Sequence, residues 1–145
     1  MKRRGPAAGR EKGFSFIEVI LSIALLSFAM LGLAQLFLLA MANNARSDQI
    51  SNAAFLAQQE MDELRTLTAD ELTALGASPL DVVIDVNGDG NNDFRRITRL
   101  TPQGLNWTVD IWVFSATQLG VDVATLVSNP EQNRVRAEIS SVICR

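Results

Sequence analysis

The chain has 145 residues, with 13 basic and 16 acidic side chains, one cysteine and no histidine. This length allows one modest folded domain beside a long helix. The absence of histidine removes the commonest general base and zinc ligand, and a single cysteine cannot form an internal disulfide. The sequence also lacks a Gly-rich phosphate loop and a GxSxG serine motif, so we do not expect an enzyme.

Residues 1–13 form a short, basic leader. They contain five basic residues and one acid, and Gly5, Pro6 and Gly9 oppose regular structure. Without this leader, counting charges leaves the rest of the chain with a formal net charge of about −7. Nucleic-acid binding through a broad surface needs a high density of Lys and Arg, so no nucleic-acid partner is expected.

Residues 14–42 are almost entirely apolar. After Glu18, about twenty-four residues carry no charge, and a membrane-spanning helix needs roughly 20 apolar residues. The basic leader predicts a cytoplasmic N-terminus, with the rest of the chain across the membrane. A secretory signal peptide is the alternative, but its apolar region is only about 7–15 residues long. A cleaved signal peptide also has no reason to carry an acid like Glu18, because a charged side chain inside hydrocarbon costs about 2.5–3.5 kcal/mol.

The residues Gly13-Phe14-Ser15-Phe16-Ile17-Glu18 resemble the processing site of type IV prepilins. In that family a prepilin peptidase cuts after the glycine and methylates the new N-terminal residue. By this resemblance Gly13 ends the leader and Phe14 is the N-methylated terminus. Glu18 matches the family's acid, which pairs with the terminal amine of a neighbouring subunit during assembly. Phe16 departs from the more usual leucine but keeps the apolar character.

The resemblance implies a structural minor pilin, closest in style to the PilV class, that enters or primes a type IV pilus-like filament. The implied partners are other pilin or pseudopilin subunits, the prepilin peptidase, the inner-membrane assembly platform and, before assembly, membrane lipid. The protein would start as a single-pass protein of the bacterial inner membrane and end in a periplasmic or cell-surface filament. The alternatives are a type II secretion pseudopilin, or a single-pass membrane protein that never polymerises and has an outer ligand-binding domain.

Two residues interrupt the apolar segment, Gly32 and Gln35. Glycine in a helix interior weakens the helix by about 1 kcal/mol relative to alanine. Gly32 is therefore a point at which the helix could melt during assembly. A small residue equally permits close packing against a neighbouring helix, and the sequence leaves both interpretations open.

Residues 43–145 are expected to form the periplasmic or filament-exposed domain. Polar residues from Asn43 to Asp48 mark the exit into water, and an apolar stripe at helical spacing follows them. The stripe consists of Ile50, Ala54, Ala57, Met61 and Leu64. We therefore predict one helix of about fifty residues, with its second half packed on the domain.

The remaining chain predicts a short helix and several strands. Thr68 and Glu71 form a capping-box pattern, and Gly76 is typical of a helix end. The strand candidates are residues 81–85, 94–100, 105–113 and 135–144, with a further short strand at 121–127. Cys144 is expected to be half buried at the end of the last strand. An antiparallel sheet packed on the long helix is an α+β fold, which is also the fold that the pilin resemblance implies.

Oxygen-bearing side chains alternate in the loop between the first two predicted strands. They are Asp85, Asn87, Asp89, Asn91 and Asp93. This pattern resembles the first nine positions of an EF-hand or dockerin-type calcium loop, with Gly90 at its sharp turn. All but Asn91 would offer side-chain oxygens, and Asn91 a backbone carbonyl. Position twelve is Arg96 rather than an acid, which predicts a dissociation constant of about 10⁻⁴–10⁻³ M. A plain turn rich in Asn, Asp and Gly is the alternative.

Overall fold

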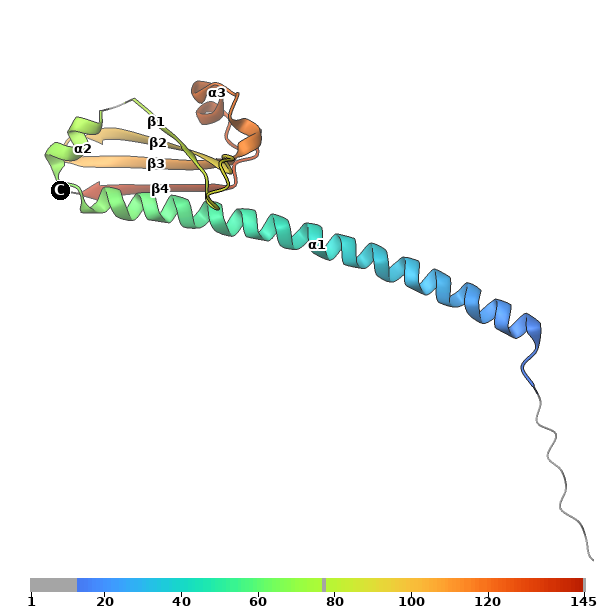
Figure 1. Ribbon diagram of the computed structural model, residues 1–145. Helices are drawn as coiled ribbons and strands as arrows, with labels where there is room; N and C mark the ends of the chain where they lie inside the picture. The colour runs from blue at the N-terminus through green and yellow to red at the C-terminus, as the bar shows by residue number, and fades with distance from the viewer. Residues whose placement is uncertain (1–12, 77, 145) are drawn as a thin grey trace, which may run out of the picture. The chain divides into compact units, whose positions relative to one another are not determined.

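The computed structural model describes residues 13–76 and 78–144, which form a long helix, a four-stranded antiparallel sheet and short helices (Figure 1). The chain divides into two compact units between Asn43 and Asn44, and helix α1 (Phe16–Thr66) contributes to both. The other elements are α2 (Ala69–Leu75), β1 (Leu80–Ile84), β2 (Phe94–Gln103), β3 (Asn106–Ser115), the 3₁₀ helix η1 (Ala116–Gln118), α3 (Val123–Ser128) and β4 (Ala137–Cys144).

The first half of α1 has no tertiary packing within the described chain. Every residue from Phe16 to Ala42 is exposed. A helix can still form here, because its backbone hydrogen bonds are made within the helix itself. The helix is long and apolar enough to cross a membrane, a test that a signal sequence near the N-terminus also passes. The Ser22 hydroxyl donates to the Glu18 carbonyl at 2.7 Å, and the Ser27 hydroxyl donates to the Ile23 carbonyl at 2.8 Å.

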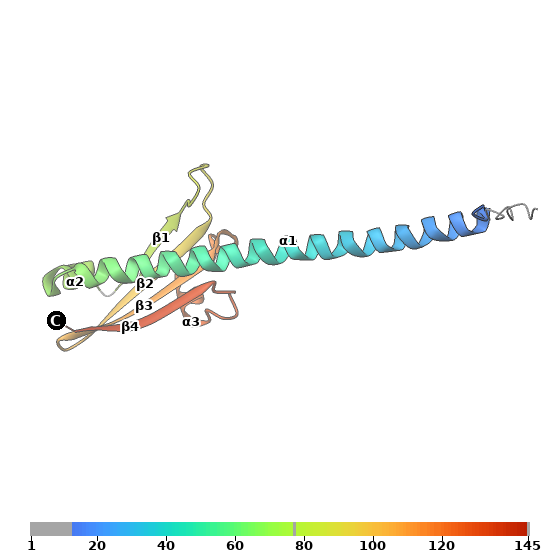
Figure 2. The same ribbon diagram turned by 90° about the horizontal axis from the view of Figure 1, so that it is seen from below.

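The second half of α1 packs on one face of the sheet, here called the inner face (Figure 2). The strands follow each other in the order β1-β2-β3-β4, and each pair is antiparallel. Alternate residues of β2 and β3, such as Leu100 and its partner Val109, point to the inner face. Full burial of a large apolar side chain on this face stabilises the folded state by about 1.5–3 kcal/mol. The predicted α+β fold is confirmed.

The opposite face of the sheet, the outer face, carries a second apolar cluster. It consists of Ile97, Trp112, Phe114 and Leu126. Leu126 belongs to α3, where a strand was predicted over 121–127; that prediction is wrong. The Asp122 side chain accepts the N–H of Ala124 at 3.0 Å and caps a short helix instead. Because α3 covers the outer face near Trp112 and Phe114, β3 is buried on both faces from Ile111 to Phe114.

The face of α1 that meets the sheet differs from the predicted stripe. Ala57, Met61 and Leu64 are buried as expected, but Ile50 is 43% exposed and Ala54 is only partly buried. In their place the helix buries Ala53, Leu56 and Glu60.

Two predictions about strand ends are also corrected. Leu105 lies in the tight turn between β2 and β3, where it is 79% exposed, rather than starting the strand. Gly104 adopts a φ of 67° there, which suits the first central position of a two-residue hairpin turn. Cys144 is exposed rather than half buried, because it lies at the last position of the final strand.

The predicted capping box of α2 is confirmed. The Thr68 side chain accepts the N–H of Glu71 at 3.4 Å, and the Glu71 carboxylate accepts the N–H of Thr68 at 2.7 Å. The helix ends at Gly76, whose φ is 77°. Leu72 of this helix is buried in the same cluster as the α1 residues.

A buried ion pair joins α1 to the inner face of the sheet. The Glu60 carboxylate contacts the Arg96 guanidinium of β2, and their side chains are only 10% and 13% exposed. Thr98, on the same strand, donates to Glu60 at 3.3 Å. Desolvating two charges offsets much of their attraction, so the pair favours one position of the helix on the sheet more than it adds stability.

A second buried arginine, Arg95, holds the outer-face segment. It donates through Nε and Nη2 to the two carboxylate oxygens of Asp81, at 2.9 and 2.8 Å. Its Nη1 donates to the backbone carbonyls of Gln118, Leu119 and Val121. The hydrogen bonds from Arg95 hold the pKa of Asp81 below its usual range. One guanidinium therefore ties β1 and β2 to the chain that leads into α3.

Replacing Glu60 with leucine should destabilise the domain by about 3 kcal/mol, because Arg96 is then left buried without its partner. The double change Glu60→Leu with Arg96→Leu should recover most of this loss, since apolar side chains replace both charges. The measurement is urea unfolding of the full chain in mild detergent, followed by tryptophan fluorescence. Glu63→Leu, at an exposed position of the same helix, is the control and should change the stability little. A double variant as unstable as the single one would contradict this account.

Candidate functional site

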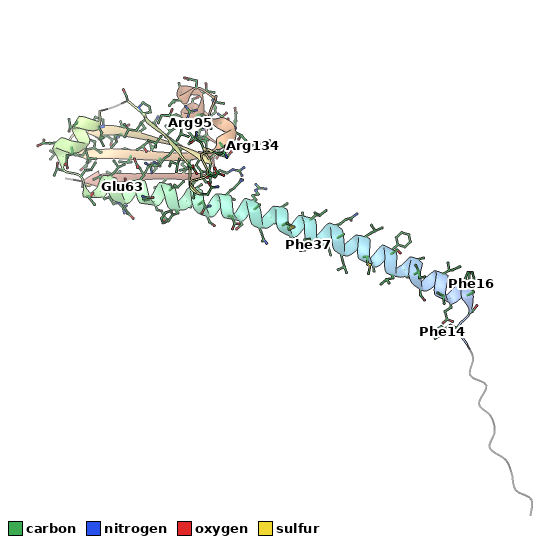
Figure 3. The ribbon with its side chains drawn as sticks, viewed as in Figure 1. Phe14, Phe16, Phe37, Glu63, Arg95 and Arg134 are labelled. Atoms are coloured by element: carbon green, nitrogen blue, oxygen red, sulfur yellow. The ribbon has the colours of Figure 1, made fainter. Side chains whose placement is uncertain are left out.

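The predicted cleavage position precedes the first turn of α1. Gly13, Phe14 and Ser15 lie outside the helix, and the Ser15 carbonyl accepts the N–H groups of Glu18 and Val19 at 2.9 and 3.2 Å. Phe14 is 83% exposed, and Figure 3 shows its side chain beside the helix start. The bond between Gly13 and Phe14 therefore lies outside regular structure, between two exposed residues.

Glu18 lies in the first turn of α1, close to this bond. It is exposed, and it forms no ion pair or side-chain hydrogen bond with any residue from 13 to 76 or 78 to 144. The N-terminal end of a helix carries partial positive charge, which suits an acid at this position. Its carboxylate is thus open to a cation from outside the chain, such as the terminal amine of another molecule.

The helix around and after Glu18 carries large apolar side chains on all its sides, with few polar residues between them. Phe16 is 81% exposed and Phe37 is 66% exposed, and Figure 3 shows both standing away from the ribbon. A helix that is hydrophobic all round is stable only inside lipid or among other apolar helices. The segment from Phe16 to Ala42 can therefore insert in a membrane or pack in a bundle of helices.

The acidic loop between β1 and β2 is folded by its own side chains. The Asp85 carboxylate accepts the N–H groups of Gly88 and Gly90, each at 2.8 Å. The Asn87 side chain accepts the N–H of Asp89 at 2.9 Å, and the Asp89 carboxylate accepts the N–H of Asn91 at 2.7 Å. At the end of the loop, the Asp93 carboxylate accepts the N–H of Val86 at 3.0 Å. These contacts are the local side-chain turns that Asn and Asp favour.

The backbone donors stabilise the ionised form of Asp85. The hydrogen bond from Gly90 is the largest effect, and together with that from Gly88 it lowers the pKa of Asp85. The oxygen donors of the loop are of the kind that calcium prefers. Among the described residues, however, there is no group of three or more His, Cys, Asp or Glu side chains placed so that it could hold a metal ion. A bound ion would therefore depend on Asn side chains, backbone carbonyls and water as well.

The structure brings the loop beside α1, a contact that sequence reasoning missed. A cavity of about 210 Å³ is lined by Asp48, Gln49 and Asn52 of the helix, by Val86, Asn87 and Asp93 of the loop, and by Phe94. The sequence had assigned Asp48 only to the exit from the membrane. Polar residues at helical spacing, Asp48 and Asn52, were the available signal for a loop packed on that side of the helix.

Comparison with known proteins finds a match to the N-terminal part of the chain. Residues 9–34 match the family model described as "Prokaryotic N-terminal methylation motif". No curated protein and no solved structure matches the chain. The matched range covers the predicted cleavage site, Glu18 and the first part of the apolar helix.

The motif and the fold agree with each other. The motif implies processing by a prepilin peptidase and assembly with pilin-like subunits, which places the protein first in the inner membrane and later in the envelope or at the surface. A long apolar N-terminal helix whose second half packs on an antiparallel sheet is the pilin-like arrangement. The chain accordingly combines a prokaryotic N-terminal methylation motif over residues 9–34 with a pilin-like fold.

Proposed function

We propose that this protein is a structural minor pilin. A prepilin peptidase cuts it after Gly13 and methylates Phe14, and the assembly platform then passes it into a type IV pilus-like filament, which it enters or primes. The observation that carries the proposal is the processing motif placed directly before a fully exposed apolar helix. Filament assembly gives that helix a permanent apolar environment outside lipid.

Two other functions share part of this evidence. A type II secretion pseudopilin has the same kind of N-terminal signal, and the aromatic strand from Trp107 to Val113 is what favours the PilV class of minor pilins. A single-pass membrane protein that never polymerises would also expose an apolar helix. Glu18 favours assembly over this last alternative, because an acid in the apolar segment is costly in lipid, and the amine of a neighbouring subunit would offset that cost more fully than the helix end alone.

The first test is the N-terminus of the protein purified from its own host. We expect mass spectrometry to find a chain that starts at N-methylated Phe14. Gly13→Leu should retain the leader, since a bulky residue replaces the glycine at the cut, whereas Gly9→Ala in the same leader should be cleaved normally. Parent protein that keeps Met1 would exclude the filament proposal.

The second test concerns Glu18. Glu18→Ala should be cleaved normally yet enter sheared filaments at least about tenfold less, since a loss of only 1.4 kcal/mol has that effect. Immunoblots of the sheared and the membrane fractions measure the ratio. Ser22→Ala is the matched control, because it removes a hydroxyl that only bonds the carbonyl of Glu18. Normal incorporation of Glu18→Ala would argue against pairing with the amine of a neighbour.

We further propose that the acidic loop takes a calcium ion weakly, through Asp85, Asn87, Asp89 and Asp93 and the backbone carbonyl of Asn91. The alternating oxygens and Gly90 support this proposal, and the arginine at position twelve makes binding weak. A bound ion would hold the loop against β1 and β2. The ion has no catalytic role in this proposal.

Calcium at several times its dissociation constant should raise the melting temperature of the full chain in detergent by a few degrees. The rise should disappear in Asp85→Ala and in Asp89→Ala, because each change removes a proposed ligand. Asp70→Ala, in the first turn of α2, should keep it. A parent protein that melts at the same temperature with and without millimolar calcium would leave the loop as a plain turn.

A further inference from the structure

Gln35 is a polar residue in the apolar half of α1 whose side chain has no partner. The two serines before it satisfy their hydroxyls on backbone carbonyls of their own helix. The Gln35 side chain is exposed and has no hydrogen bond to the rest of the chain over residues 13–76 and 78–144. Its amide has two donor hydrogens and an acceptor oxygen, all of them open.

The position of Gln35 along the helix makes this costly in a membrane. Ala42, the last residue of the apolar segment, is seven positions further along the helix, which is about 10 Å at 1.5 Å per residue. The hydrocarbon core is about 30 Å thick, so the amide lies within it when the segment spans the bilayer. Water does not reach this depth, and an amide without a partner there is unfavourable. This step relies on the membrane stage of the proposed function.

A second copy of the chain offers the matching group at the matching depth. Single-pass copies insert in the same orientation, so their helices run parallel and their Gln35 side chains lie at one level. A carboxamide is both donor and acceptor, and two of them can bond reciprocally across a helix interface. Gly32 lies one turn earlier on the same side of the helix. A Cβ at Gly32 would meet nothing within 4 Å, so a neighbouring helix can approach closely.

We propose that the protein pairs with a second copy of itself in the membrane before assembly, through reciprocal hydrogen bonds between the two Gln35 side chains beside Gly32. The pair forms between helices in lipid and does not use the terminal amine or Glu18. It is therefore independent of cleavage. The polar contact fixes which sides of the two helices meet, as polar side chains do in membrane bundles.

Self-association can be measured by energy transfer in phosphatidylcholine vesicles. Donor and acceptor dyes are attached to Cys144, the single cysteine of the sequence, whose side chain is exposed. The full chain should show transfer that falls as lipid dilutes it. Gln35→Leu should weaken association about three- to thirtyfold, the range expected for one interhelical hydrogen-bond contact. Gln35→Asn should retain association, and Ser27→Ala should match the parent because its hydroxyl serves its own helix.

The vesicle experiment tests membrane pairing separately from filament assembly. The vesicles contain no peptidase or platform, so association there is independent of processing, and Gly13→Leu should associate like the parent. A parent that inserts in the vesicles but stays monomeric would overturn the proposal, even if the protein is cleaved and assembled in its host. Association unchanged in Gln35→Leu, or lost equally in Ser27→Ala, would overturn it as well.

Discussion

An apolar helix surface that the described part of the chain leaves uncovered is the constraint on which this protein depends. From Phe16 to Ala42 every side chain is exposed, and burial of such surface is the dominant favourable term in folding and association. In the proposed function this surface is covered first by lipid and then by other helices. The cleavage site, Glu18 and Gln35 all lie on or next to this segment, so the proposed processing, axial pairing and lateral pairing would all act on one element.

The sheet and its short helices hold the second half of that same helix. Glu60 and Arg96 set its position on the inner face, around a core in which Met61 and Leu64 meet residues of β2, β3 and β4. On the outer face, Arg95 fastens the segment that leads into α3. Apolar burial supplies most of the stability of such a domain. The buried charges decide which of several similar packings is adopted, because a shifted helix would leave them without partners.

The two candidate sites differ in how much of their chemistry lies within the chain. In the proposed function Glu18 gains its partner from another subunit, and within the described chain its carboxylate is exposed and has no partner. The acidic loop already satisfies most of its oxygens with backbone N–H groups, as at Asp85 and Asp89. An ion would add to an existing turn rather than create one. Its effect would therefore fall on the stability of the domain, whereas the effect proposed for Glu18 falls on assembly.

Local patterns in the sequence by themselves determined the processing motif, the long helix, the capping box at Thr68 and most of the strands. These features depend on neighbouring residues, on helical or alternating spacing and on turn chemistry, all of which a sequence displays directly. Only the tertiary structure decided that Glu60 is buried, that Ile50 gives way to Ala53 and Leu56 on the packed side of α1, and that residues 123–128 form a helix over the outer face. Burial depends on partners that are distant in the chain, such as Arg96 for Glu60, and no local pattern specifies which of them will meet.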